Sequence, residues 1–380
     1  MTSRQQLRLL HVTQPTEAGV AQCVLHYATA QVRSGHEVHV ACPPSGPLAA
    51  RLRQEGVRVH EWPARRAPGP GTLGETRRLR ALVGAVRPDL LHLHAAKAGL
   101  AGRLLARGRT PTVFQPHAWS FDAVTGPARS ATVLWERLGA RWTTLLICVS
   151  TAERDAGRRA GVRVARTEVV PNGVDLQAFR FADGAARRSA RRTLGLDEDA
   201  PLCVCVGRLT RQKGQDLLLA AWPRVLASVP SAQLVLVGNG PEEAALRAAA
   251  PAQVRFVGHR DDTPAWLAAA DVVAAPSRWD GMALAPLEAM ATGRAVVVSD
   301  AVGMRESVPT GAGAIVPTAD AHAWAAALAA RLDGRIDPDA EGRTGRRSVE
   351  EHHDLSATLS RLEAAYALAM GPVDSSTSQA

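Results

Sequence analysis

The amino-acid sequence predicts an α/β protein of two doubly wound, Rossmann-like domains that face an interdomain cleft. Three observations support this prediction. The chain has 380 residues, more than one ordinary hydrophobic core organises. Short apolar runs alternate with helical patterns along most of it, as in parallel sheets covered by helices on both faces. The alternation breaks once, around Pro171 and Gly173, and divides the runs into two series.

The first series occupies residues 1–175, the predicted N-terminal domain. It opens with a strand, a polar turn and a helix at 7–12, 13–19 and 20–35. Apolar periodicity predicts further strands at 37–42, 57–61, 89–94, 112–115 and 145–150, and further helices at 47–55, 72–86, 98–107 and 127–142.

The second series occupies residues 176–352, the predicted C-terminal domain. It predicts strands at 201–207, 232–238, 254–258, 271–277, 295–300 and 313–317, and helices at 184–194, 214–228, 241–250, 263–269, 285–292 and 320–332. A last helix, 353–370, is expected to pack back on the N-terminal domain, and the polar residues 371–380 to form a disordered tail. Ligands of such sheets bind beyond the carboxyl ends of the strands, so the loops there are where functional residues are expected.

Charge is distributed unevenly along the chain. Residues 1–175 carry 24 basic and 12 acidic side chains, a net +12, whereas residues 176–380 carry 21 and 24, a net −3. The basic half indicates an anionic partner, either a membrane surface or a phosphate-bearing acceptor, and a generally basic solvated surface is an equal alternative. Since no basic stripe is interleaved with aromatic residues and no nucleic-acid motif occurs, nucleic acid is not expected as a partner.

Hydropathy bears on location. No stretch has the 18 or so apolar residues of a membrane helix, and the N-terminus lacks the apolar core of a signal peptide. We therefore expect a cytoplasmic protein, with peripheral contact to the inner membrane face as an option. The contact element would be the helix at 127–142, which carries Arg129, Trp135, Arg137, Arg141 and Trp142. The alternative is that both tryptophans pack inward.

Two cations lie in the loop that follows the strand 201–207. Arg208 and Lys213 stand five residues apart, and Gly214 opens the next helix. Cations beside a helix N-terminus suit a diphosphate, because the helix adds free N–H donors and a positive dipole end. Solvated surface charge is the other interpretation.

A second candidate site is SRWDGMALAPLEAMATG, residues 277–293. Asp280 lies in the loop after a strand, and Glu288 lies on the following helix, where a carboxylate can accept from ribose hydroxyls. The intervening residues can turn backbone N–H groups toward a ligand; they are Gly281, Met282, Ala283 and Leu284. A helix-capping aspartate and an exposed glutamate are the alternative.

These segments together resemble the donor site of family-four retaining glycosyltransferases (glycosyl transferases group 1), which have the GT-B fold. The resemblance covers nearly the whole chain, through VVPNGVD, LVGNGPEE, VRFVGHRDD, AADVVAAPSRWDG and LAPLEAMATG in that family's order. It implies that Arg208 and Lys213 hold the donor diphosphate and Glu288 the ribose, and that Asp280 faces the hydroxyls of the transferred sugar. The family pattern has glutamate where Asp280 stands, so donor choice or activity can differ here.

The resemblance also implies roles in the N-terminal half. Gly19 corresponds to the family's glycine-rich loop near the donor phosphate, although one of its two usual glycines is missing. His117 corresponds to the histidine that approaches the donor sugar. His94 and Lys97, at a strand-to-helix junction, are acceptor-binding candidates, with Lys97 meeting an acceptor phosphate. A structural role is the alternative for His117, and a place at a surface helix N-terminus is the alternative for Lys97.

No metal or cofactor is expected. His11, His92, His352 and His353 show no metal-ligand spacing, and no paired aspartates follow a strand. Cations and helix dipoles would then take the place of a metal at the leaving diphosphate. The nucleotide-sugar is the donor substrate.

The sequence thus predicts a retaining, metal-independent glycosyltransferase, a hexosyltransferase of EC class 2.4 in polysaccharide or glycoconjugate biosynthesis. The C-terminal domain would bind a UDP- or GDP-linked sugar, and the N-terminal domain a hydroxyl acceptor. That acceptor is a lipid-linked glycan, a cell-surface glycan or a small natural product. A sugar-nucleotide epimerase of similar shape and a non-catalytic partner subunit are the alternatives.

Overall fold

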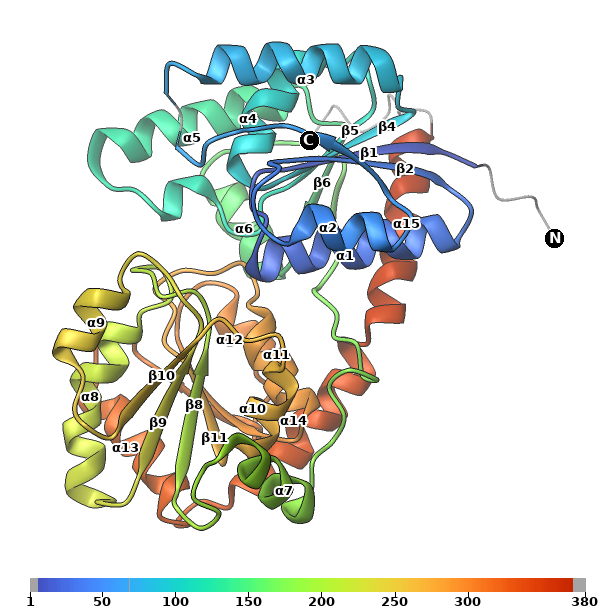
Figure 1. The fold of residues 1–380 in the computed structure, drawn as a ribbon. Helices are drawn as coiled ribbons and strands as arrows, with labels where there is room; N and C mark the ends of the chain where they lie inside the picture. The colour runs from blue at the N-terminus through green and yellow to red at the C-terminus, as the bar shows by residue number, and fades with distance from the viewer. Residues whose placement is uncertain (1–5, 68, 372–380) are drawn as a thin grey trace. The chain divides into compact units, whose positions relative to one another are not determined.

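The computed structural model describes residues 6–67 and 69–371, which fall into two compact units (Figure 1). The first comprises the described residues up to Pro171 and those from Leu359 onward, and the second runs from Asn172 to Thr358. The expected domain limits, at residues 175 and 352, lie a few residues from these divisions. Apart from Gly371, the expected disordered tail lies outside the described residues.

The first unit is built on a parallel sheet. In its described residues the strand order is β3-β2-β1-β4-β5-β6-β7. The strands are β1 (Arg8–Thr13), β2 (Glu37–Cys42), β3 (Arg58–Glu61), β4 (Leu90–His94), β5 (Thr112–Gln115), β6 (Leu145–Cys148) and β7 (Thr167–Val169).

Helices cover both faces of this sheet. They are α1 (Ala18–Arg33), α2 (Leu48–Gln54), α3 (Thr72–Val86), α4 (Ala95–Ala106), α5 (Gly126–Ala140), α6 (Thr151–Arg159) and α15 (Leu355–Met370), with a 3₁₀ turn at Ser120–Asp122. In Figure 1, α1 and α2 cover one face, and α3 and α4 cover the other. Most of α15 belongs to this unit and lies near the end of α1, where His36 Nε2 is 3.2 Å from an oxygen of Glu363.

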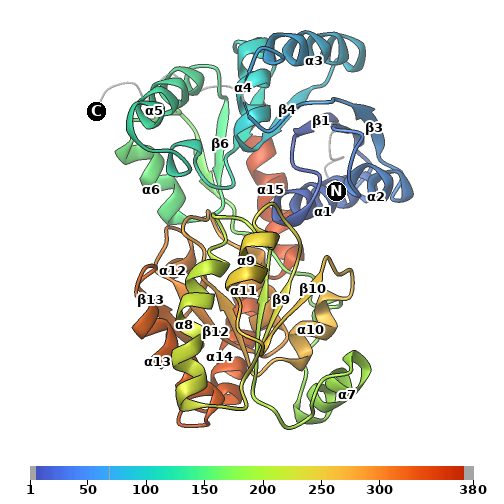
Figure 2. The ribbon, with the colours of Figure 1, turned by 60° about the vertical axis from the view of Figure 1, so that its left-hand side comes forward.

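The second unit repeats the plan with a sheet ordered β10-β9-β8-β11-β12-β13. Its strands are β8 (Leu202–Val206), β9 (Gln233–Val237), β10 (Val254–Gly258), β11 (Val272–Ala275), β12 (Ala295–Ser299) and β13 (Gly313–Val316). Its helices are α7 (Gly184–Leu194), α8 (Gln215–Ser228), α9 (Glu243–Ala249), α10 (Thr263–Ala269), α11 (Leu284–Ala291), α12 (Met304–Ser307), α13 (Ala321–Leu332) and α14 (Pro338–His352). Helices α8 and α13 lie side by side in both views (Figures 1 and 2).

Each sheet has one point where the direction of strand order reverses. It lies between β1 and β4 in the first sheet and between β8 and β11 in the second. Loops on either side of such a switch point diverge, which leaves room for a ligand beyond the carboxyl ends of the two strands. The fold therefore offers one such position in each unit.

Within the described residues, strand β7 and helices α6, α12 and α14 were not predicted from the sequence. Helix α14 contains two glycines, which lower helix propensity and hid it. A Cβ at Gly342 would collide with the carbonyl oxygen of Gly293, so this glycine permits the close packing of α14 against α11 and the following turn.

Candidate functional site

An ion pair joins the two loops at the switch point of the second sheet. Lys213, after β8, places its Nζ 2.7 Å from Oδ2 of Asp280, after β11. The two side chains are 22% and 10% exposed. The hydroxyl of Ser277 donates to the same carboxylate oxygen at 3.4 Å. A cation and a carboxylate thus stand together where doubly wound sheets bind ligands.

Gly214 lets the first of these loops approach the second. Its φ is +70°, and a Cβ there would collide with the carbonyl oxygen of Pro276. Glycine alone meets both conditions without strain. Because α8 begins at the next residue, Lys213 lies just before a helix N-terminus, where free N–H groups and the helix dipole favour an anion.

A second set of contacts holds the same two loops together. The guanidinium of Arg278 donates two hydrogen bonds to the carboxylate of Asp216, at 2.7 and 2.6 Å, and thereby lowers the pKa of that carboxyl group. The backbone N–H of Arg278 donates to the carbonyl of Gln212 at 2.7 Å. Sequence reasoning missed this clamp, because 62 residues separate Asp216 from Arg278 and no spacing rule links them.

Arg208 begins the loop, and its side chain is half-buried. Its carbonyl oxygen accepts a hydrogen bond from the side-chain amide of Gln215 at 3.0 Å. Gln215 is itself buried in the first turn of α8. The backbone at Arg208 is therefore held against the helix that Lys213 precedes.

The predicted backbone-donor segment leads into α11. Gly281, Met282 and Ala283 are buried, and α11 starts at Leu284. The side-chain amide of Asn172 donates to the carbonyl of Met282 at 2.7 Å and fixes this turn. The N-terminus of α11 therefore adjoins the loop that carries Asp280. The motif VVPNGVD contains Asn172, but its spacing gave no sign of this contact.

Glu288 lies in the second turn of α11 and is half-buried. Desolvation raises the pKa of its carboxyl group to about 7, against the attraction of the Lys213 ammonium, which lowers it. Burial therefore outweighs the nearby cation. Near neutral pH this carboxyl group exchanges between an ionised form, which only accepts hydrogen bonds, and a neutral form, which also donates one.

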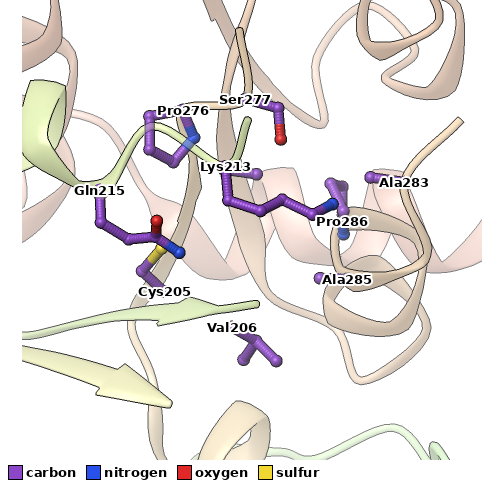
Figure 3. A pocket seen from close by; sticks show the side chains of 10 residues that line it. Cys205, Val206, Lys213, Gln215, Pro276, Ser277, Ala283, Ala285 and Pro286 are labelled. Carbon is purple, nitrogen blue, oxygen red and sulfur yellow. The ribbon is translucent and has the colours of Figure 1, made fainter. Parts of the chain in front are cut away.

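A small pocket opens beside Lys213, between β8 and α11 (Figure 3). Figure 3 shows the Lys213 side chain extending across it toward Pro286. The lining is otherwise apolar or uncharged, and comprises Cys205, Val206, Gln215, Ala275, Pro276, Ser277, Ala283, Ala285 and Pro286. An anionic group in this pocket would meet one ammonium and the start of α11.

Four imidazoles gather at the switch point of the first sheet. Strand pairing sets His11 of β1 beside His92 of β4. His11 Nδ1 lies 2.9 Å from His94 Nε2, and His94 Nδ1 lies 3.1 Å from His117 Nε2. His94 is completely buried. The predicted acceptor contact of His94 therefore cannot be direct in this structure, and the Nδ1 atom of His94 contacts the half-buried His117 instead.

The expectation that His11 and His92 show no metal-ligand spacing is corrected here. Ligand atoms of His11, His92 and His94 all lie within 4.8 Å of one another. The sequence hid this arrangement, because the pairing of β1 with β4 unites residues about 80 positions apart. Contacts within the protein hold these three imidazoles together. His11 and His94 are hydrogen-bonded to each other, and His92 Nδ1 lies 2.6 Å from the hydroxyl of Tyr366.

The turn that carries His117 is strained and anchored. His117 and Ala118 have φ values of +55° and +109°, which residues other than glycine rarely adopt. The carboxylate of Glu153 accepts from the N–H of Ala118 at 2.6 Å and from the N–H of Val149 at 2.8 Å. The buried Glu153 was missed with α6. A signal existed, since Ser150 and Glu153 form an S-x-x-E capping box in which Ser150 Oγ accepts from the Glu153 N–H at 3.0 Å.

Two further predictions for the first unit are revised. Gly19 is the second residue of α1 rather than part of the preceding loop, and Ala18 takes the positive φ, +60°. The ammonium of Lys97 is buried and pairs with Glu75 at 2.6 Å, with a hydrogen bond to Thr72 Oγ1 at 3.0 Å. The acceptor-phosphate assignment of Lys97 is therefore not carried further.

Helix α5 presents a mixed apolar and basic surface. Trp135 and Trp142 are half-buried, with ring centroids 6.3 Å apart, so each packs on the other. Arg129, Leu134, Arg137 and Leu138 of α5 are exposed, and so is Arg141, which follows the helix. None of the helices within residues 6–67 and 69–371 combines the length and apolar character needed to cross a membrane.

Two family models match the chain. The model described as glycosyl transferase 4-like domain matches residues 18–173, and the one described as glycosyl transferases group 1 matches residues 200–333. A Mycobacterium tuberculosis (H37Rv) protein is 35% identical over 322 residues, which cover 78% of this chain and 80% of that protein. The chain belongs to the group 1 glycosyltransferases. It is therefore an enzyme of the EC 2.4 class.

The names of similar proteins describe related reactions. The M. tuberculosis protein is named a GDP-mannose-dependent alpha-(1-6)-phosphatidylinositol monomannoside mannosyltransferase. A Corynebacterium glutamicum protein, named a GDP-mannose-dependent monoacylated alpha-(1-6)-phosphatidylinositol monomannoside mannosyltransferase, is 35% identical over 195 residues. That alignment covers 48% of this glycosyltransferase and about half, 51%, of the relative.

A solved structure confirms the fold of the glycosyltransferase. Anabaena HepE, in complex with UDP and glucose, matches with a TM-score of 0.82 and covers 95% of this chain and 100% of its own. The two sequences are 21% identical, so the match establishes the GT-B fold alone. The predicted family, enzyme class and α/β fold of two parallel-sheet units are thus confirmed.

Proposed function

We propose that this glycosyltransferase moves a hexose, with retention and without a metal, from a nucleotide-sugar to a hydroxyl group of a lipid-linked or other glycan acceptor. The observation that carries the proposal is the Lys213–Asp280 pair at the switch point, between the N-termini of α8 and α11. The pair provides a cation for a diphosphate and a carboxylate for sugar hydroxyls. Arg208 and Glu288 complete the assignment to diphosphate and ribose.

The proposed donor is UDP- or GDP-linked, and GDP-mannose is the first to test. Two similar proteins are named GDP-mannose-dependent mannosyltransferases, whereas the matched structure holds UDP and glucose. The charged groups of the pocket would meet the diphosphate, which both donors share. They therefore do not favour one base over the other.

The proposed chemistry needs no strong base. The bond between the anomeric carbon and the diphosphate breaks as Arg208, Lys213 and the start of α11 stabilise the departing charge. The acceptor oxygen attacks the anomeric carbon from the same face, and its proton passes to the departing phosphate. Asp280 would orient the sugar hydroxyls. The cations take the place that a metal holds in other transferases.

The proposed acceptor is lipid-linked and reached from the cytoplasm at the inner membrane face. The relatives' names include phosphatidylinositol monomannosides, and residues 1–175 carry a net charge of +12. The exposed Leu134 and Leu138 of α5, flanked by Arg137 and Arg141, suit shallow contact with anionic lipid. Flotation with anionic vesicles tests this, and binding that ignores salt and lipid charge would contradict it.

One assay tests the transfer itself. The protein is incubated with GDP-mannose, UDP-glucose or UDP-galactose and a bacterial lipid extract, with and without EDTA, and products are analysed by mass spectrometry and NMR. We expect a lipid one hexose heavier, with the anomeric configuration of the donor, in either condition. An epimerised donor in the absence of acceptor, or inversion, or loss of activity in EDTA, would contradict the corresponding part of the proposal.

A further inference from the structure

A continuous chain of hydrogen bonds leads from the interior of the first unit to His117. It starts at Gln31 on α1, whose Oε1 lies 2.7 Å from His11 Nε2. It continues from His11 Nδ1 to His94 Nε2 at 2.9 Å, and from His94 Nδ1 to His117 Nε2 at 3.1 Å. Gln31, His11 and His94 are at most 1% exposed, and His117 is half-buried.

All three imidazoles are neutral at physiological pH. Burial lowers the pKa of His11 to about 4 and that of His117 to about 3, and it lowers the pKa of His94 well below its ordinary value. A neutral imidazole has one N–H donor and one nitrogen lone pair. Each ring in the chain must therefore donate on one side and accept on the other.

The direction of the chain follows from its buried end. The Gln31 amide presents its oxygen, not its NH2 group, to His11 Nε2. An amide oxygen only accepts, so in this arrangement His11 Nε2 carries the proton that is donated to Gln31. His11 Nδ1 then accepts from His94 Nε2–H, and His94 Nδ1 accepts from His117 Nε2–H. His117 Nδ1 is left with a bare lone pair, and it has no hydrogen-bond partner among residues 6–67 and 69–371.

We propose that Gln31, His11 and His94 are positioning residues that lock His117 in the Nε2–H tautomer, so that His117 Nδ1 is a fixed hydrogen-bond acceptor for a sugar hydroxyl. The identity of that hydroxyl rests on the proposed function, but the tautomer does not. An acceptor that cannot become a donor selects substrates with a hydroxyl at this position over deoxy analogues. The strained, Glu153-anchored backbone at His117 and Ala118 holds the ring in place.

His92 and the pair His39–His60 do not belong to the hydrogen-bonded series from Gln31 to His117. His92 Nδ1 contacts the Tyr366 hydroxyl instead, whose raised pKa keeps it a donor. On β2 and β3, His39 Nδ1 lies 2.8 Å from His60 Nε2, and these two rings are nearly parallel. Within the described residues, the hydrogen bonds of His39 go to His60 and Glu37 and not to Gln31, His11, His94 or His117, so His60→Gln is a matched control.

Nitrogen-15 NMR of histidine side chains in the ligand-free protein tests the proposal. Long-range spectra identify which ring nitrogen carries the proton. For the wild type we expect protonated Nε2 and bare Nδ1 in His11, His94 and His117. The opposite tautomer at His117, or a mixture of both, would overturn the proposal. So would a stoichiometric metal ion in the purified protein, since a metal would take a lone pair that the chain uses.

Two substitutions at Gln31 separate a positioning role from a merely structural one. Gln31→Met removes the terminal acceptor, and we expect His117 to populate both tautomers, whereas Gln31→Glu keeps an acceptor and the wild-type spectrum. His60→Gln should change nothing at His117. An unchanged His117 spectrum in folded Gln31→Met would contradict the proposal. If that variant does not fold, the wild-type and Gln31→Glu spectra decide.

Kinetics then link the tautomer to the transferase. We expect kcat/KM to fall about tenfold in Gln31→Met, as for one neutral hydrogen bond, and to be restored in Gln31→Glu. A protein without transferase activity would overturn the proposed function and leave the NMR result standing. If Gln31→Met shows both tautomers of His117 but keeps the wild-type kcat/KM, the role of His117 Nδ1 in transfer is contradicted, and the assignment of the tautomer is not.

Discussion

The switch point of the first sheet holds neutral imidazoles, whereas that of the second holds charged groups. His11 and His94 are fully buried, and desolvation keeps them uncharged. Lys213 and Asp280 keep part of their surface in solvent and neutralise each other. The same topological position thus serves two chemistries. Charges suit a diphosphate, and neutral rings with fixed tautomers suit hydroxyl groups, so the difference suggests a division of labour between the units.

The largest effect on activity is expected from removing the cations at the switch point of the second sheet. Replacing both Arg208 and Lys213 with alanine removes two cations from the leaving group. Removing one preorganised donor typically costs about 10²–10³ in kcat, so we expect no measurable transfer by the double variant. The melting temperature should stay near the wild-type value. Arg247→Ala, which removes an exposed cation of α9 in the same unit, should retain activity. Wild-type turnover by the double variant would refute the assignment.

Lys97 and Lys213 are expected to differ in what they support: the buried Lys97 stabilises the fold, and Lys213 serves catalysis. Lys97 pairs with Glu75, and the two side chains are only 3% and 9% exposed. Lys97→Met leaves a buried carboxylate without its cation, which should lower the free energy of unfolding by about 3 kcal/mol. Urea denaturation measures this change. Lys213→Met should cost much less stability but most of the activity, and the reverse pattern would contradict our assignment.

The pH dependence of binding tests Glu288. Its pKa of about 7 lies above the ordinary value, so the carboxyl group is mostly protonated at pH 6 and ionised at pH 8. If ribose hydroxyls donate to the carboxylate, binding below pH 7 requires loss of a proton. Affinity for a nucleotide-sugar should then rise up to about tenfold per pH unit below 7 and level off above it. Calorimetry on Glu288→Gln should give an affinity that does not change with pH. A pH dependence that persists in this variant would mean that another group titrates.

The smallest expected effect concerns position 280. Asp280→Glu adds one methylene and would push the carboxylate toward the sugar or disturb its contact with Lys213. A single methylene is worth about 1–3 kcal/mol of discrimination, so we expect the ratio of kcat/KM between two donor sugars to change about tenfold. Competition assays with paired donors measure this ratio. An unchanged ratio would mean that Asp280 does not face the sugar.

Local sequence signals predicted much of the fold and the second switch point. The alternation of apolar runs with helical patterns predicted most strands and helices within a few residues. Arg208, Lys213, Asp280 and Glu288 lie within short segments after strands, where parallel-sheet topology brings loops together. The grouping of Lys213, Asp280 and Glu288 follows from the fold class, before any side-chain contact is known.

The parts that sequence reasoning missed depend on contacts between distant residues. The imidazole chain exists because β1, β4 and β5 are neighbours, and no pattern in the sequence states the order of strands. Helix α14 tolerates Gly342 because α11 packs closely against it, which outweighs helix propensity. Lys97 was predicted to bind an acceptor phosphate, but in the structure it forms an ion pair with Glu75 of α3. These predictions failed because they depended on contacts between residues far apart in the sequence, which local patterns do not reveal.

Calorimetric titration of GDP-mannose and UDP-glucose into the wild type and Lys213→Ala tests the central claim most directly, because it needs no acceptor. We expect at least one donor to bind the wild type, Lys213→Ala to weaken this binding at least tenfold, and Arg247→Ala to leave it unchanged. Equal affinity of the wild type and Lys213→Ala for that donor would contradict the assignment of the charged switch point to the donor diphosphate.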